Sequence, residues 1–400
     1  MEIDEDSSTE GLQLLAWIGH LNLEGWPSST TEAQLTSYLE ANTMKVIVWF
    51  MVILGALPFY GNTASASCSS WNLHYSNARD LTLNGRSQEA LKEANLSIIE
   101  SRSRHGQETL NTEKSLELLA TLTRETGNYH KAMRLVSKAY DINCRIKGKT
   151  DPNSIRLLSD LGYLAVLNGD FKRGASYYNE ALKTCEVANR MACITAAEPM
   201  LGLAQLMAMN GNYSESEKLY RAAIERLCCF SKYRPELKLK LALAMENLGT
   251  VCRSQGNYAD AVKCFGRTKV LYQSQNTSQV ERLGHIFLCL GDTYAKWGKP
   301  ERAIKCYKDA LVILENHPDA ESTMLSGLVL KGLGDTFRKK GNLALASNYY
   351  KKAVINFETK ASVGQGPLLL ETVKSLSEVY KGMGLDSEAQ AVQVKTLAME

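Results

Sequence analysis

A glycine returns along residues 67–400 at a nearly constant interval, and small and apolar residues keep fixed distances from it. The intervals between successive glycines are 42, 42, 42, 45, 42, 43 and 43 residues. A period that persists over seven intervals indicates an internal structural repeat. The glycines are Gly85, Gly127, Gly169, Gly211, Gly256, Gly298, Gly341 and Gly384.

Each glycine has the same neighbours. A small residue stands five positions after it, as at Ala261 and Ala303, and an aromatic or branched residue often follows four positions later, as at Phe265 and Tyr307. A Leu-Gly or Leu-small pair precedes it by seven to eight residues, as at Leu290-Gly291. Small residues let two helices approach closely, and glycine supplies the backbone freedom of a tight turn. The pattern therefore predicts a repeated unit of helix, glycine turn and helix.

The repeat resembles the tetratricopeptide repeat, and its period of about 42 residues is similar to that of the kinesin light chain and nephrocystin-type subgroup. The usual tetratricopeptide unit has 34 residues, so each helix here has room for about one more turn. The resemblance implies an all-α, right-handed superhelical solenoid of about eight antiparallel helix pairs. The units at Gly85 and Gly384 keep less of the pattern, as expected of terminal caps.

One interval is three residues longer than its neighbours. It contains the stretch "CCFSKYRPE" before Gly256, and it follows a unit with Ser216 at the usual alanine position. We expect a longer loop or a local change of path at this point.

The first 66 residues differ from the repeats. Residues 1–43 hold eight carboxylates and no Lys or Arg, and we expect a weakly structured acidic segment. Residues 44–66 combine Lys45, an apolar run, Pro58 and a small-residue triplet. This composition is typical of a signal peptide or signal-anchor, because the run is shorter than a membrane span of about 20 residues.

The compartment therefore has two interpretations. A functional signal would place the protein in the secretory pathway or attach it to a membrane through residues 44–66. The ten cysteines favour a reducing, cytoplasmic compartment, because none form a CxxC pair and they suit core packing as free thiols. In that case residues 44–66 would form an apolar helix on the repeats.

The remaining composition argues against several classes of function. The net charge of +3 gives no basic field for nucleic acid. The six histidines are scattered, and the glycines form no phosphate-binding loop. We therefore predict a protein that is not an enzyme, with no catalytic residues, no cofactor and no metal site.

A solenoid of this kind has a long concave surface formed by the first helix of each pair. Polar side chains on these helices in the C-terminal half are our candidate partner-binding residues, and their cations would suit a partner with acidic groups. The alternative is that they are simply solvated. The candidates are Asn247, Arg253, Asp292, Lys296, Lys331, Asp335, Arg338, Lys374 and Lys381.

The corresponding positions in the N-terminal half are more apolar, and they are Tyr163, Val166, Leu167, Leu201 and Met209. They fit a drier segment of groove or an intramolecular contact with residues 1–66, and packing into the neighbouring repeat is the interpretation that we favour. We therefore hypothesise a scaffold that binds a protein or peptide partner, with cargo or complex adaptor work implied by the resemblance. The alternative is a membrane-tethered or secretory accessory subunit of a membrane complex. The sequence does not specify the oligomeric state.

Overall fold

A computed structural model describes residues 68–106, 108–188, 194–232, 234–274, 280–316, 320–358 and 366–397. The chain divides into two units between Ala66 and Ser67, and the described residues all belong to the second. The predicted acidic segment and the predicted signal or anchor lie outside the described residues. Within them, no helix is both long enough and apolar enough to cross a membrane.

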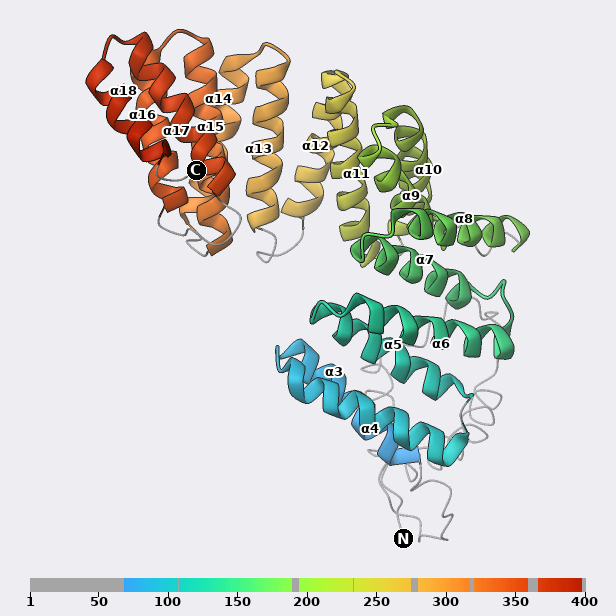
Figure 1. The fold of residues 1–400 in the computed structure, drawn as a ribbon. Helices are drawn as coiled ribbons and strands as arrows, with labels where there is room; N and C mark the ends of the chain where they lie inside the picture. Colours follow the sequence, from blue (N-terminus) through green and yellow to red (C-terminus); the bar gives the residue numbers. More distant parts are fainter. Residues whose placement is uncertain are drawn as a thin grey trace, which may run out of the picture. The chain divides into compact units, whose positions relative to one another are not determined.

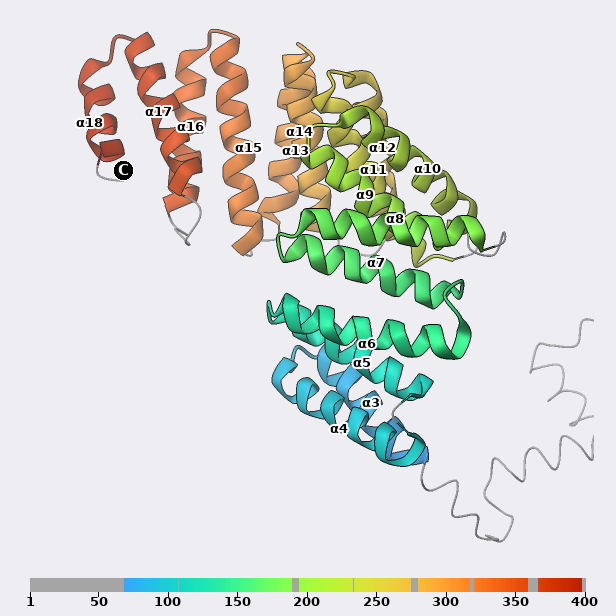
Figure 2. The same cartoon turned by 45° about the vertical axis from the view of Figure 1, so that its right-hand side comes forward.

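Sixteen α-helices and no strands make up the part of the chain that the structure describes (Figures 1 and 2). They form eight successive pairs, so the predicted all-α repeat fold is confirmed. The helices are α3 (Cys68–Leu83), α4 (Ser87–His105), α5 (Leu110–Glu125), α6 (Tyr129–Lys147), α7 (Pro152–Leu167), α8 (Phe171–Val187), α9 (Ala197–Met209), α10 (Tyr213–Ser231), α11 (Leu237–Ser254), α12 (Tyr258–Gln273), α13 (Val280–Lys296), α14 (Pro300–Glu315), α15 (Ala320–Lys339), α16 (Leu343–Glu358), α17 (Gly366–Gly382) and α18 (Asp386–Leu397).

Each repeated glycine lies in the turn between the two helices of a pair. All eight have a positive φ, between 71° and 81°, which glycine adopts without the steric cost that other residues meet. The next helix begins two residues after the glycine, and the residue between them precedes its first turn. Asn128, for example, accepts a hydrogen bond from the backbone N–H of Lys131 at 3.1 Å, and so satisfies a donor left free at the helix start. The Gly-Asn pair therefore ends one helix and caps the next.

The glycine of the Leu-Gly pair has a different role, which is close packing. A Cβ atom at Gly291 would lie 2.4 Å from the ring of Tyr307, the aromatic residue of the following helix. The same clash would occur between Gly334 and the ring of Tyr350, at 2.6 Å. Both tyrosines are almost completely buried. The aromatic ring thus fills a space that exists because the first helix of the pair has no side chain there.

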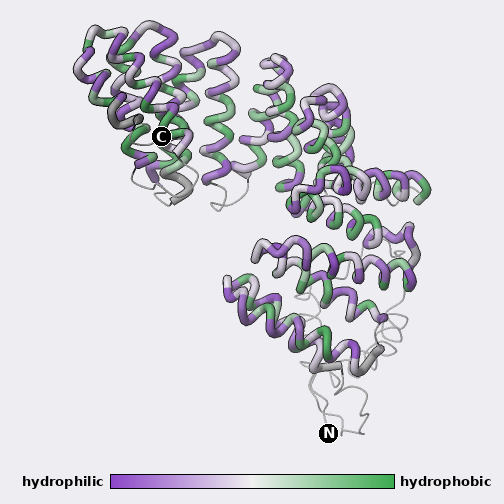
Figure 3. Tube along the Cα trace, viewed as in Figure 1, coloured by the Kyte–Doolittle hydropathy of each residue, from purple (hydrophilic) through white to green (hydrophobic). Residues whose placement is uncertain are grey.

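The pairs stack in chain order, and each helix packs on the next one. Odd-numbered helices also contact one another directly, as α7 contacts α9 and α13 contacts α15. We call the surface that they share the odd-helix face. Figure 3 shows apolar and polar residues alternating along every helix, as expected where one side of each helix is buried against its neighbours.

The three extra residues at "CCFSKYRPE" and beyond are divided between a connection and a helix. α10 and α6 both have 19 residues, whereas the connection 232–236 is one residue longer than 148–151 and α11 is two residues longer than α7. The expected loop is thus longer by only one residue, and the alternative, a local change of path, stays a prediction. The longest connection between described helices is instead 188–196, which precedes the short 13-residue helix α9.

Candidate partner-binding surface

The predicted candidates in the C-terminal half lie on α11, α13, α15 and α17, the odd-numbered helices. Four of the eight charged candidates form ion pairs with a residue on a neighbouring odd-numbered helix. These ion pairs are Arg253–Asp292 at 3.6 Å, Lys331–Glu371 at 2.9 Å and Arg338–Glu378 at 2.6 Å. A carboxylate of a partner would therefore compete with carboxylates that the protein itself supplies.

The two candidate aspartates are held from behind by the buried tyrosines. Tyr307 donates its hydroxyl hydrogen to Asp292 at 2.8 Å, and Tyr350 donates to Asp335 at 2.6 Å. Burial raises the pKa of Asp292, while the Tyr307 hydroxyl and Arg253 act in the opposite direction. These aspartates thus connect the repeat core to the odd-helix face, and their hydrogen-bonding capacity is already partly used.

The remaining candidates lie at exposed positions. Asn247 is exposed and bonds the hydroxyl of Tyr220, whose pKa burial raises to about 12. Lys296 and Lys381 lie at the C-terminal ends of α13 and α17, and Lys374 lies in the middle of α17. All three side chains are exposed. The structure thus places all nine candidates on odd-numbered helices, and it joins five of them in ion pairs.

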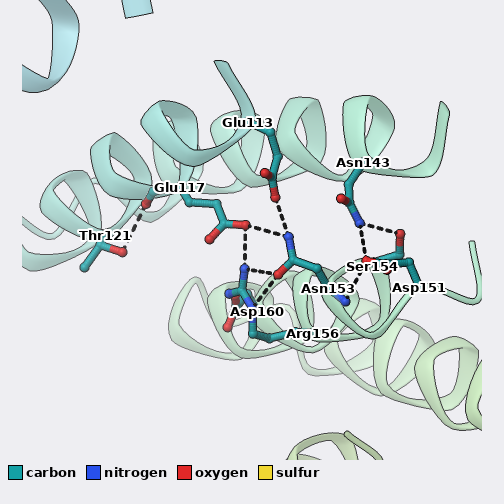
Figure 4. Close-up of polar contacts among 9 residues, drawn as sticks. All are labelled: Glu113, Glu117, Thr121, Asn143, Asp151, Asn153, Ser154, Arg156 and Asp160. Atoms are coloured by element: carbon teal, nitrogen blue, oxygen red, sulfur yellow. Dashed lines mark hydrogen bonds and ion pairs between the residues drawn. The ribbon is translucent and has the colours of Figure 1, made fainter. Parts of the chain in front are cut away.

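The N-terminal half has a polar network that the sequence analysis missed, and Figure 4 shows it between α5 and α7. Arg156 is its centre, at 2.5 Å from Glu117 and 2.7 Å from Asp160. Asn153 donates to Glu117 at 3.2 Å and also to Glu113. Charged and polar side chains therefore share this part of the surface with the predicted apolar positions, among them Tyr163 and Leu201.

Glu113 is the most deeply buried carboxyl group of the network, with 2% of its surface exposed. Burial, a hydrogen bond with Glu117 and the charge of Glu117 together raise the pKa of Glu113 to about 8. Burial also raises the pKa of Asp160, against the opposing effect of Arg156. Glu113 therefore keeps its proton at neutral pH, which lets two carboxyl groups share one small space.

Two neighbouring cavities open beside this network. One, of about 290 Å³, lies among α5, α7, α9 and α11, and the other, of about 340 Å³, adjoins it. Both are lined by Arg156, Glu198 and Lys240. Lys240 and Glu198 also form an ion pair across α9 and α11.

The second cavity has an apolar wall as well as a charged rim. Leu201, Leu227 and Leu237 supply apolar surface, while Arg234 adds a cation at the rim. An apolar wall with a few polar groups is the usual character of a site that holds a side chain of a ligand. The arrangement can bind but offers no metal-binding cluster among the described residues.

A spacing rule would have located this network. The ion pairs between odd-numbered helices join residues 39 to 42 positions apart, slightly less than or equal to one repeat, as in Arg156–Glu117 and Lys240–Glu198. Glu117 stands ten residues before Gly127, the position that the candidate Lys331 holds before Gly341, so a count along the helices could have reached it. Arg156 stands thirteen residues before Gly169, about one turn earlier than any candidate.

Eight stacked helix pairs with a shared odd-helix face define a helical-repeat protein of the kind that binds other proteins. Residues 240–316 match the tetratricopeptide repeat family model, so this chain carries tetratricopeptide repeats. A search of curated protein sequences found no match to the chain.

Solved structures show the same fold at low sequence identity. BtubC (BKLC) from P. vanneervenii is 22% identical, with 58% of this chain and 94% of that chain covered and a TM-score of 0.51. A Signal Transduction ATPase with Numerous Domains protein with a tetratricopeptide repeat sensor, from Pyrococcus horikoshii, is 12% identical, with 84% and 48% covered and a TM-score of 0.60. This chain thus spans about half of that protein. The apo form of RapI is 12% identical, with 72% and 97% covered and a TM-score of 0.52.

Proposed function

We propose that this protein is a non-catalytic scaffold that binds a peptide segment of a partner protein along the odd-helix face. The tetratricopeptide repeats support the class of function. The two adjoining cavities at α5, α7, α9 and α11 support the place, because they offer apolar surface and charges at the same point. In this proposal an apolar side chain of the peptide enters the cavity beside Leu201.

The charges of the rim bear on the composition of the peptide. Arg156 and Lys240 are occupied by internal carboxylates, whereas Arg234 is exposed at the edge of the second cavity. We therefore propose an apolar anchor residue followed by a carboxylate that reaches Arg234. Adaptor work of the kinesin light chain type, the most concrete version of this function, is supported by the long repeat period.

A peptide-display selection on the full chain tests the proposal. Selected peptides would be synthesised, and their affinities for the variants Leu201→Lys and Arg234→Glu measured by fluorescence anisotropy. A charge in the apolar wall should weaken binding at least about 30-fold, and reversal of the rim charge about 10-fold. Lys183→Glu, on the even-numbered helix α8, is the control and should leave the affinity unchanged.

Peptides that bind wild type and both cavity variants with the same affinity would contradict the proposal, because the binding surface would then lie elsewhere. Circular dichroism of each variant would separate lost binding from lost folding.

A further inference from the structure

Three even-numbered helices of the C-terminal half expose a branched apolar residue at the same repeat position. Val270 on α12, Val312 on α14 and Ile355 on α16 each lie fourteen residues after the turn glycine of their pair. Their exposed fractions are 60%, 60% and 58%. Equivalent positions of stacked repeats fall on one line, so we call these three residues the apolar stripe.

The fold does not require apolar residues at this position. In the three preceding pairs the same position holds Asp141, Lys183 and Glu225, and those helices pack in the same way. Branched residues are also weaker helix formers than Lys or Glu, so the stripe brings no benefit to an isolated helix. Ile99 on α4 is apolar and exposed too, but it is separated from the stripe by these three charged positions.

Charged residues flank the centre of the stripe in a fixed order. Lys308 lies four residues before Val312, and Glu315 lies three residues after it, so both share its side of α14. Both side chains are exposed. Around Ile355, Lys351 and Glu358 stand at the same spacings, but the Lys351 ammonium lies 5.3 Å from the ring of Tyr380 and the Glu358 side chain is partly buried, so this pair is not counted as part of the contact.

A surface with a cation at one end, an apolar centre and an anion at the other is complementary to itself after a half-turn. If two copies meet with α14 antiparallel to α14 of the second copy, Val312 meets Val312 and Lys308 meets Glu315 at both ends. A twofold axis along the stripe produces this arrangement and also pairs Ile355 with its own copy.

We propose that the apolar stripe is the contact through which two copies of this chain associate. It lies on even-numbered helices, so the proposal is independent of peptide binding at the odd-helix face. Three apolar positions and two charge contacts are few for a permanent dimer, and a weak, concentration-dependent association is expected.

Sedimentation velocity of the full chain over a range of concentrations tests this proposal. Wild type should pass from monomer to dimer, and Val312→Lys should raise the dissociation constant at least about 10-fold. Glu225→Lys introduces the same residue at the same repeat position outside the stripe, and it should leave the association unchanged.

A mixing experiment is more specific. Lys308→Glu alone puts carboxylate against carboxylate, and Glu315→Lys alone puts ammonium against ammonium, so each variant should associate more weakly than wild type. In a mixture of the two, every charge meets its opposite, and dimers should return. A wild-type chain that stays monomeric at all concentrations would overturn the proposal and would favour another partner on the stripe. Dimers that form equally well with Val312→Lys, together with no recovery of dimers on mixing, would also overturn it.

Discussion

The odd-helix face has two regions that share a backbone design and differ in charge chemistry. Between α5 and α11, several carboxyl groups surround Arg156, one of them is buried and protonated, and two cavities lie beside them. Between α11 and α17, cations and carboxylates are matched by ion pairs, and Glu371 and Glu378 are mostly exposed. The repeat thus fixes where side chains lie on the odd-helix face. The type of residue at each position decides whether the side chain stabilises the fold or can contact a partner.

Removal of the central cation should separate the two regions most clearly. Arg156→Ala leaves Glu117 and Asp160 without their shared partner, and we expect the free energy of unfolding to fall by about 2 kcal/mol. Arg338→Ala breaks a pair with an exposed carboxylate, and we expect a loss within about 0.5 kcal/mol. Urea unfolding of both variants measures the difference, and equal losses would contradict the distinction drawn between the regions.

The pH dependence of stability should come from the N-terminal region. Because Glu113 has a pKa of about 8 in the folded chain and an ordinary value near 4.3 when unfolded, the folded state binds more protons between these values. Its contribution to stability is complete below about pH 4 and is lost as the pH rises toward 8. We expect this loss to exceed about 1 kcal/mol between pH 5 and pH 8.

Unfolding of Glu113→Gln at several pH values measures this contribution, because glutamine cannot titrate. The difference between variant and wild type should change with pH in the stated direction. The matched control is Glu371→Gln on α17, where the carboxylate is 61% exposed, and its curve should run parallel to that of wild type. A Glu113→Gln curve that is also parallel would show that Glu113 is charged in the folded state.

The smallest effect is expected from the C-terminal candidates. Arg338→Glu combined with Lys374→Glu should weaken binding of a partner peptide by about two- to fivefold, since charges at the rim of an interface mainly alter the rate of association. Fluorescence anisotropy at low and high salt measures it. A loss as large as that from Leu201→Lys would move the main binding site to the C-terminal half.

The repeat framework could be predicted from the sequence because it depends on local chemistry. A glycine with positive φ and a glycine beneath an aromatic ring leave marks at fixed positions, as at Gly298 and Gly291. These glycines can be recognised in a single sequence, without knowing which residues contact them. The predicted signal or anchor at residues 44–66 stays a prediction, since it lies outside the described residues.

The functional surface was harder to predict because it depends on neighbours one repeat away. Lys240 reaches Glu198 over 42 residues although the interval between their turn glycines is 45, since Lys240 stands 16 residues before Gly256 and Glu198 only 13 before Gly211. Whether Arg253 is available also depends on Asp292 in the next pair. Such contacts become visible only when the stacking of the pairs is known.

The short helix α9 has a consequence for how the chain unfolds. In a linear array, stability passes between nearest neighbours, so cooperativity is weakest where neighbours share the least surface. Helix α9 has 13 residues and follows the nine-residue connection 188–196, so it offers a shorter surface for packing than the helices around it. We expect the array to open as two independent blocks, one on each side of α9, and amide hydrogen exchange would show different protection for the two. The cavities beside Glu198 lie at the boundary between these blocks.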